Sequence, residues 1–210
     1  MNRVLIVTWE YPPLIEGGLA RHVRKLSEAL IRRGAEVHVL TRGGDQATVE
    51  ETMAGVQIHR IVEPERPTDL AEFVTWVERM NSDMLAAGVE LGDRYEFDLV
   101  HGHDWLVASA CDHLARRYDC PLGTTIHATE YGRHQGWVDK HPQSHIHGVE
   151  KWIANRSDRV ITCSDFMREQ VADIFAVEES RITVIPNGID PEDLPANDPA
   201  ELARLRSQFA

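Results

Sequence analysis

An alternation of short apolar runs with amphipathic segments constrains the fold of this chain more than any other feature. The run RVLIVT (3–8) is rich in β-branched residues, whereas the apolar residues of GLARHVRKLSEALIRRG (18–34) recur at helical spacing up to a terminal glycine. A second apolar run, AEVHVLTR (35–42), follows at once. Two strands joined by a helix pair in parallel through a right-handed crossover. The chain is therefore predicted to open with a βαβ unit.

The same alternation continues along the rest of the chain. Further strands are predicted at 55–61, where a sheet edge is expected, and at 97–103, 120–128, 158–164 and 181–190. Helices are predicted at 69–91, 105–117 and 143–156, with a last one ending near Phe175. Seven strands alternating with helices predict an α/β fold with a Rossmann-like, doubly wound and mostly parallel sheet. Ligands of such sheets bind beyond the carboxyl ends of the strands, where the winding reverses.

Charge and hydropathy exclude several classes of partner. The chain has 210 residues with 22 Lys and Arg against 34 Asp and Glu, a net charge of −12. This balance argues against nucleic acid or an anionic membrane as a partner. The apolar run at the N-terminus is shorter than the core of a signal peptide, and no later run approaches membrane-spanning length. A cytoplasmic protein is therefore expected.

Composition divides the chain into three parts. Residues 1–185 carry the alternating strands and helices and are predicted to form one domain. Residues 186–198 concentrate proline, acidic residues and asparagine, as an interdomain linker does. Residues 199–210 begin an amphipathic helix that is too short to form a core of its own. They are interpreted as the start of a C-terminal domain that the chain does not contain.

A glycine pair follows the first predicted strand. Gly17 and Gly18 lead directly into the first helix, and their lack of a Cβ lets backbone N–H groups approach an anion at the positive end of the helix dipole. The alternative is that the pair only permits a tight loop. The spacing matches neither the dinucleotide fingerprint nor the P-loop, so it leaves the two interpretations open.

Polar residues also follow the strand at 97–103. In the motif HGHDW, His101 and His103 alternate onto one face of the strand, and Asp104 and Trp105 stand at the start of the next helix. Asp104 is a typical helix-capping residue. In the other interpretation its carboxylate receives a sugar hydroxyl while the Trp105 indole covers the apolar face of the sugar.

A histidine occupies the corresponding place after the strand at 120–128. His127 begins a long polar loop, TTIHATEYGRHQGW, which also carries Glu130 and Arg133. These two residues, together with Glu10 and Trp105, are candidate acceptor or cleft contacts. Because Gly-Gly, Asp and His follow three separate strands, their convergence on one crevice predicts a polar site.

The chain holds 11 histidines, which raises the question of a metal. His141 and His145 lie four residues apart on a possible helix, but the glutamate and third ligand of an H-E-x-x-H zinc site are missing. The three cysteines contain no C-x-x-C pair. Neither a metal nor another cofactor is expected.

Five segments together resemble a known family: VTWEYPPLIEGGLARHVRKLSEALIRRGAEVHVLT, VHGHDW, TTIHATEYGRHQG, SDRVITCSDFMREQV and ITVIPNGID. In this order and spacing they are similar to the N-terminal domain of GT-B glycosyltransferases of family 4, near the bacterial glycogen synthase-like enzymes. The resemblance implies a two-domain enzyme that retains anomeric configuration without a metal. Such an enzyme would transfer glucose to an α-glucan from ADP- or UDP-glucose, which the C-terminal domain would mostly bind.

The resemblance also implies residue roles. Gly17 and Gly18 would bring backbone amides to the distal phosphate of the donor, and His127 would contact the transferred sugar and stabilise its developing positive charge. Asp104 would lie beside that sugar or the acceptor, and residues 186–188 would form the hinge. The chain alone would be inactive, since the C-terminal half is absent.

Two residues depart from the glycogen synthase pattern. Glu16 stands where a lysine is typical and would repel a phosphate that it faced, and Ala128 replaces an asparagine. The departures leave open a family 4 enzyme that transfers another sugar, such as mannose, to a lipid or a small polyol. A non-catalytic dinucleotide-binding module and a metal-dependent hydrolase are the alternatives from other classes. The first of these needs a G-x-G-x-x-G turn that the chain lacks.

Overall fold

An eight-stranded sheet forms the middle layer of the computed structural model, in the order β3-β4-β2-β1-β5-β6-β7-β8. The structure describes residues 2–43, 45, 51–63, 65–190 and 198–208. The strands are β1 (Arg3–Val7), β2 (Glu36–Arg42), β3 (Glu51–Met53), β4 (Val56–Ile61), β5 (Leu99–His103), β6 (Leu122–Ile126), β7 (Arg159–Thr162) and β8 (Ile182–Val184). Neighbouring strands are parallel except for the antiparallel pair β3 and β4. The predicted Rossmann-like, mostly parallel sheet is confirmed.

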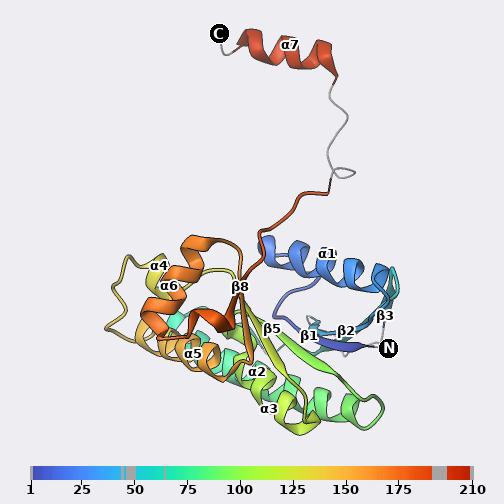
Figure 1. Ribbon diagram of the computed structural model, residues 1–210, viewed down its shortest axis with the longest axis vertical. Helices are drawn as coiled ribbons and strands as arrows, with labels where there is room; N and C mark the ends of the chain where they lie inside the picture. Colours follow the sequence, from blue (N-terminus) through green and yellow to red (C-terminus); the bar gives the residue numbers. More distant parts are fainter. Residues whose placement is uncertain (1, 44, 46–50, 64, 191–197, 209–210) are drawn as a thin grey trace.

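Helices cover both faces of the sheet (Figure 1). They are α1 (Gly18–Arg32), α2 (Leu70–Gly92), α3 (Ala108–Tyr118), α4 (Glu130–Arg133), α5 (Gln143–Arg156), α6 (Asp165–Phe175) and α7 (Pro199–Gln208), with two 3₁₀ turns, η1 (Trp105–Val107) and η2 (Glu179–Arg181). In Figure 1, α1 lies on one side of the sheet and α2 and α3 lie on the other. This arrangement is the double winding that the alternation predicts.

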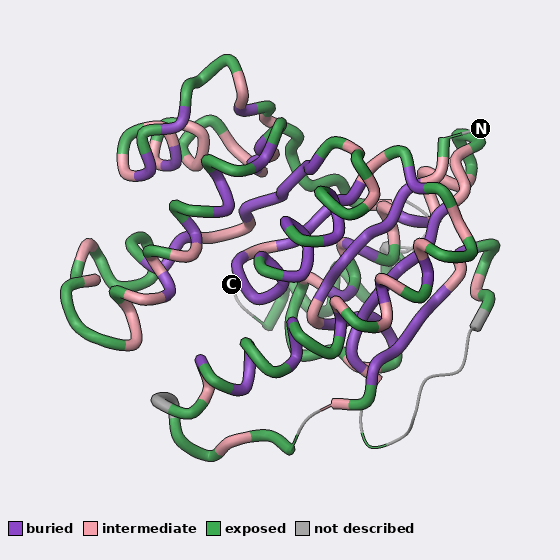
Figure 2. Tube along the Cα trace, turned by 90° about the horizontal axis from the view of Figure 1, so that it is seen from below, coloured by how far each residue is buried: buried purple, intermediate pink, exposed green. Residues whose placement is uncertain are grey.

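The apolar runs form the core because both faces of each inner strand are covered. In β1, Val4 and Ile6 pack in the cluster that contains Val23 of α1. The alternate residues Leu5 and Val7 pack in the cluster beneath α2 and α3. The period of two along the strand thus buries each residue from Val4 to Val7 on one face or the other. Figure 2 shows the inner strands as a continuous buried layer.

The predicted strands differ from the observed ones at both ends of the sheet. The strand at 55–61 is not an edge, because β3 pairs with β4 through a hairpin whose turn residues Ala54 and Gly55 have φ of 50° and 88°. Two successive positive φ angles are the geometry of a tight hairpin turn. Three residues of β3 are too few to show a period in the sequence. The strand predicted at 181–190 ends at Val184.

The winding reverses at β1. This strand pairs with β2 on one side and β5 on the other; β4 and then β3 lie beyond β2, and β6, β7 and β8 lie beyond β5. The crevice at the carboxyl ends of β1 and β5 is therefore where a ligand is expected.

Helix α7 forms over Pro199–Gln208, where an amphipathic helix was predicted. Residues 191–197 of the predicted linker 186–198 lie outside the described residues. The boundaries 1–185, 186–198 and 199–210 remain predictions.

Candidate active site

The predicted residues Asp104 and His127 meet at the switch point of the sheet. The backbone N–H of His127 donates to Asp104 Oδ1 at 2.8 Å, and the backbone N–H of Asp104 donates to the carbonyl of Thr125 at 2.9 Å. The Asp104 side chain makes no capping hydrogen bond to η1, so the capping interpretation does not hold. Its carboxylate instead fixes the backbone of the loop that carries His127.

A backbone strain accompanies this contact. Asp104 has φ of 59° and ψ of −179°, a region that is almost restricted to glycine. Burial raises the pKa of Asp104 to about 6, against the effect of the hydrogen bond from the backbone of His127. The carboxyl is therefore mostly ionised at neutral pH.

Three imidazoles gather beside Asp104. His103 Nδ1 and His127 Nε2 are 3.1 Å apart. The centre of the His22 ring lies 5.6 Å from the centre of the His103 ring and 4.7 Å from that of the His127 ring. Burial lowers the pKa of His127 to about 4 and holds the pKa of His103 and His22 below the usual value. All three rings are neutral at pH 7, so each offers one donor and one acceptor nitrogen.

His22 was not among the residues predicted for the site. It lies in the first turns of α1, on the same helix that begins at Gly18, so its approach to His127 depends on the rotation of α1. Two further residues join from later in the chain. Cys163 Sγ is 3.7 Å from His127 Nδ1 and 3.6 Å from Asn187 Oδ1, which brings part of the predicted linker to the crevice.

The glycine turn is closed by a carboxylate of the chain itself. Glu10 Oε2 accepts from the N–H groups of Glu16 at 2.5 Å and Gly17 at 3.1 Å, and Glu10 Oε1 accepts from Ala20 at 3.2 Å. Glu10 is 1% exposed, so it lies inside the turn and not on the crevice surface. Beside Gly18 the space is open, since no atom lies within 4 Å of where a Cβ would stand.

Glu16 points away from the glycine amides. Its carboxylate pairs with Arg42 and, at 2.6 Å, with Arg66 Nη2. These guanidinium groups hold the pKa of Glu16 below its usual value even though burial acts in the opposite direction. The position of Glu16 in the sequence suggests that it repels a phosphate. The positive charges of Arg42 and Arg66 reduce that repulsion.

The remaining candidate cleft residues lie in two environments. Trp105 is 7% exposed and packs in the core, with its ring 6.2 Å from Phe73. Glu130 is 5% exposed and contacts His134 at 3.0 Å, while the half-exposed Arg133 lies 3.6 Å from Glu130. Trp105 therefore belongs to the core under the crevice. Of Trp105, Glu130 and Arg133, Arg133 is the most accessible to solvent.

A buried glutamate that the sequence did not single out supports this loop. Both oxygens of Glu150 accept from the backbone N–H of Glu130 at 2.9 Å. Burial raises the pKa of Glu150 to about 8 from an ordinary value of 4.5. Because the folded state binds this proton more tightly than the unfolded state does, Glu150 contributes most stability below pH 4.5 and progressively less up to about pH 8.

We expect Glu150→Gln to gain stability relative to the parent chain as pH rises from 5 to 8, because glutamine accepts the same hydrogen bond without ionising. Urea denaturation across this range measures the difference in free energy of unfolding. Glu78→Gln, on the exposed side of α2, is the matched control. A difference for Glu150→Gln that stays constant with pH would contradict the assignment.

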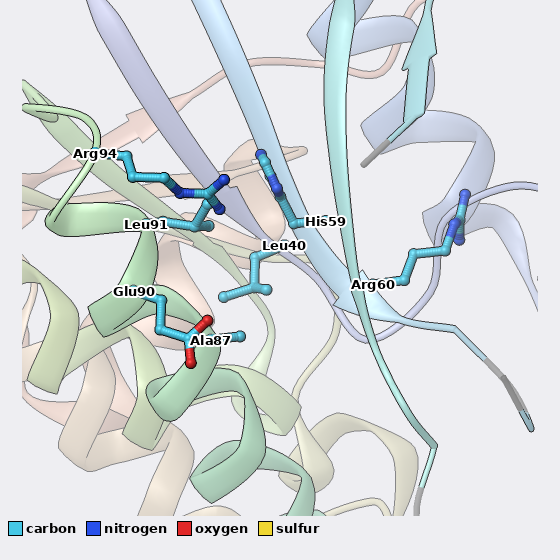
Figure 3. Close-up of a pocket in the computed structure, with 7 residues that line it drawn as sticks. All are labelled: Leu40, His59, Arg60, Ala87, Glu90, Leu91 and Arg94. Carbon is cyan, nitrogen blue, oxygen red and sulfur yellow. The ribbon is translucent and has the colours of Figure 1, made fainter. Parts of the chain in front are cut away.

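A separate pocket lies between α2 and the strands β2 and β4 (Figure 3). It is lined by Leu40, His59, Arg60, Ala87, Glu90, Leu91 and Arg94. Arg60 points away from the others in Figure 3 and donates to the carbonyl of Pro12 at 2.6 Å. The pocket contains none of the predicted site residues, so the crevice at the switch point remains the candidate active site.

Comparison with known proteins decides the family. Residues 16–193 match the family described as Glycosyltransferase Family 4. The chain belongs to glycosyltransferase family 4. The resemblance that the five sequence segments show is thereby confirmed.

Two relatives and one solved structure relate this family 4 chain to characterised enzymes. It is 42% identical over 200 residues to a glycogen synthase of Mycobacterium tuberculosis, covering 90% of this chain and 48% of the relative. It is 26% identical over 209 residues to a D-inositol 3-phosphate glycosyltransferase of Kineococcus radiotolerans, covering 90% and 46%. Its fold matches a sucrose-phosphate synthase from Thermosynechococcus elongatus with a TM-score of 0.74 at 18% identity, covering 100% and 52%. The chain spans about half the length of the curated relatives it matches.

The fold comparison agrees with the prediction of one half of a GT-B glycosyltransferase. Each helix within the described residues is too short or too polar to traverse a bilayer.

Proposed function

We propose that this chain forms one side of the active site of a retaining glycosyltransferase that transfers glucose from ADP- or UDP-glucose to an α-glucan. The observation that carries the proposal is the placement of His127 at the switch point, with its backbone held by Asp104 at 2.8 Å. The 42% identity to a glycogen synthase supports the choice of sugar and acceptor. A C-terminal domain beyond this chain binds most of the donor, so the chain alone is inactive.

The reaction exchanges one bond for another at the anomeric carbon. The bond from C1 of the sugar to the diphosphate oxygen breaks, and the nucleoside diphosphate leaves with the electron pair. An acceptor hydroxyl forms the new bond to C1 on the face that the diphosphate leaves, and its proton passes to the departing diphosphate oxygen. Positive charge develops on the sugar ring as the first bond breaks.

The chain's own residues suit this charge. A neutral imidazole at His127 binds a sugar hydroxyl without repelling the developing cation. The imidazole stays neutral because burial lowers the pKa of His127 to about 4. The carboxylate of Asp104 holds the loop that carries His127 in place. The open space beside Gly18 gives the distal phosphate of the donor room at the N-terminus of α1.

The proposal includes the partners and the compartment. The chain acts on a nucleotide sugar and a carbohydrate together with its C-terminal domain, in the cytoplasm, and not on nucleic acid or at a membrane. The transfer proceeds without a metal ion. The hard cations that assist diphosphate departure prefer oxygen ligands. The one group of three potential metal ligands within the described residues consists of imidazoles, which offer nitrogen instead.

We expect His127→Ala to lower kcat/KM by ~10²-fold or more in the complete polypeptide, since it removes a preorganised polar group at the reacting sugar. ADP-glucose and UDP-glucose are each assayed with glycogen and maltose, in the presence and absence of a chelator. His113→Ala, an exposed histidine on α3, is the matched control. No transfer from either donor, or unreduced transfer by His127→Ala, would contradict the proposal.

A small polyol phosphate is the second candidate acceptor. The observation that favours it is the 26% identity to a D-inositol 3-phosphate glycosyltransferase. Glu16 and Ala128, which depart from the glycogen synthase pattern, are consistent with a different acceptor. The same assay with inositol phosphates in place of glycogen distinguishes the two.

A further inference from the structure

Three imidazole nitrogens from separate elements lie within one small volume. His22 comes from α1, His103 from the end of β5 and His127 from the residue after β6, and one nitrogen of each lies within 4.8 Å of the others. The sequence places these histidines far apart and in no metal-binding motif. Their approach results from the switch point of the sheet.

The spacing fits coordination of one ion. Zinc binds imidazole nitrogen at about 2.0–2.1 Å in tetrahedral geometry, which sets the ligating nitrogens roughly 3.3 Å apart. His103 Nδ1 and His127 Nε2 are 3.1 Å apart, and a nitrogen of the partly exposed His22 lies within 4.8 Å of the cluster. The three histidines leave the fourth position for water or a ligand.

The second nitrogen of the His127 ring also has a contact. His127 Nδ1 lies 3.7 Å from Cys163 Sγ, whereas Nε2 faces His103. A contact at the second nitrogen of a ligating imidazole helps to fix its tautomer and orientation. Asp104 adds a nearby negative charge that favours a cation.

A second pair of histidines provides a contrast. His38 Nδ1 contacts His59 at 2.9 Å and His38 Nε2 contacts Glu36 at 3.1 Å, so both nitrogens of that ring have partners. His103 Nε2, in contrast, is buried and has no hydrogen-bond partner among the described residues. His103 therefore has a partner on Nδ1, the nitrogen that faces His127, and none among the described residues on Nε2.

We propose that His22, His103 and His127 form a binding site for a divalent transition-metal ion, with Zn²⁺ as the preferred occupant. Imidazole ligands suit zinc, copper, iron and nickel, whereas magnesium and calcium prefer oxygen ligands. A bound ion takes the His127 nitrogen that would otherwise face the sugar, so metal and donor exclude each other. That consequence rests on the proposed function, whereas metal binding does not.

Equilibrium dialysis and calorimetry of the 210-residue chain with Zn²⁺ and Mg²⁺ test the site without any assay of transfer. We expect one Zn²⁺ per chain and no binding of Mg²⁺. His22→Ala and His127→Ala should each weaken Zn²⁺ binding by ~10²-fold or more, since even partners outside the coordination shell are worth 10–100-fold. Circular dichroism and metal-free unfolding curves establish that both variants fold.

The double variant His141→Ala/His145→Ala is the matched control, because these two histidines form the alternative surface site and their ring centres are 6.3 Å apart. It should bind Zn²⁺ as the parent chain does. The proposal is overturned if the parent chain binds no stoichiometric Zn²⁺ at micromolar concentration. It is also overturned if the double variant loses binding while His22→Ala retains it.

Discussion

Asp104→Ala is expected to reduce transfer by the complete polypeptide at least ~10²-fold, because a displacement of about 1 Å at a reacting group has effects of this size. The Asp104 carboxylate accepts from the backbone N–H of His127 at 2.8 Å and so sets where the imidazole stands. Asp104→Asn keeps an acceptor oxygen in the same place and should retain most of the activity. Steady-state kinetics with both variants measure the effect. Equal losses in the two would show that charge, and not position, is what Asp104 supplies.

The strained backbone at Asp104 allows its effect on activity to be measured separately from its effect on stability. Its φ of 59° with ψ of −179° is favourable for glycine and unfavourable for alanine by about 1–3 kcal/mol. Asp104→Gly should therefore be more stable than Asp104→Ala by ~1–3 kcal/mol, although both lack the carboxylate and should lose activity alike. Urea denaturation of the two variants gives the comparison. Equal stability would mean that the residue is not strained.

The sequence predicts this site where local pattern and sheet topology are sufficient. Strands β5 and β6 are parallel neighbours, so their carboxyl ends lie at the same edge of the sheet. Asp104 and His127 follow these two strands and therefore meet as expected. His22 and Asn187 could not be predicted, because their contacts depend on how α1 rotates and where the chain leaves β8. The same holds for Glu150, whose partner Glu130 is 20 residues away.

Two predicted orientations show the limit of the pattern. Trp105 follows the strand as a crevice residue should, yet its indole enters the core because apolar area is available beneath η1. Glu16 follows the glycine turn as a phosphate-facing residue would, yet Arg42 and Arg66 attract it from 26 and 50 residues away. Strand ends fix where a residue lies, and long-range partners fix where its side chain points.

Arg42→Ala is expected to lower the free energy of unfolding by ~3 kcal/mol, the low end of the effect of removing one partner from a buried ion pair, because Glu16 and Glu63 are partly exposed. Arg42 is 2% exposed, pairs with Glu16 and Glu63, and donates from Nε to the carbonyl of Trp9 at 2.6 Å. Its guanidinium also lies 4.7 Å from the centre of the Trp9 ring. The substitution leaves the carboxylates of Glu16 and Glu63 and the partly buried carbonyl of Trp9 without this donor. Urea denaturation measures the loss.

Exposed and conservative variants sharpen this test. Arg24→Ala removes an i,i+4 pair between the exposed Arg24 and the more buried Glu28 and should change stability by about 0.5 kcal/mol or less. Arg42→Lys keeps the charge but not the planar fork, so it should recover only part of the loss. A loss for Arg42→Ala as small as that for Arg24→Ala would mean that solvent screens the pairs around Arg42.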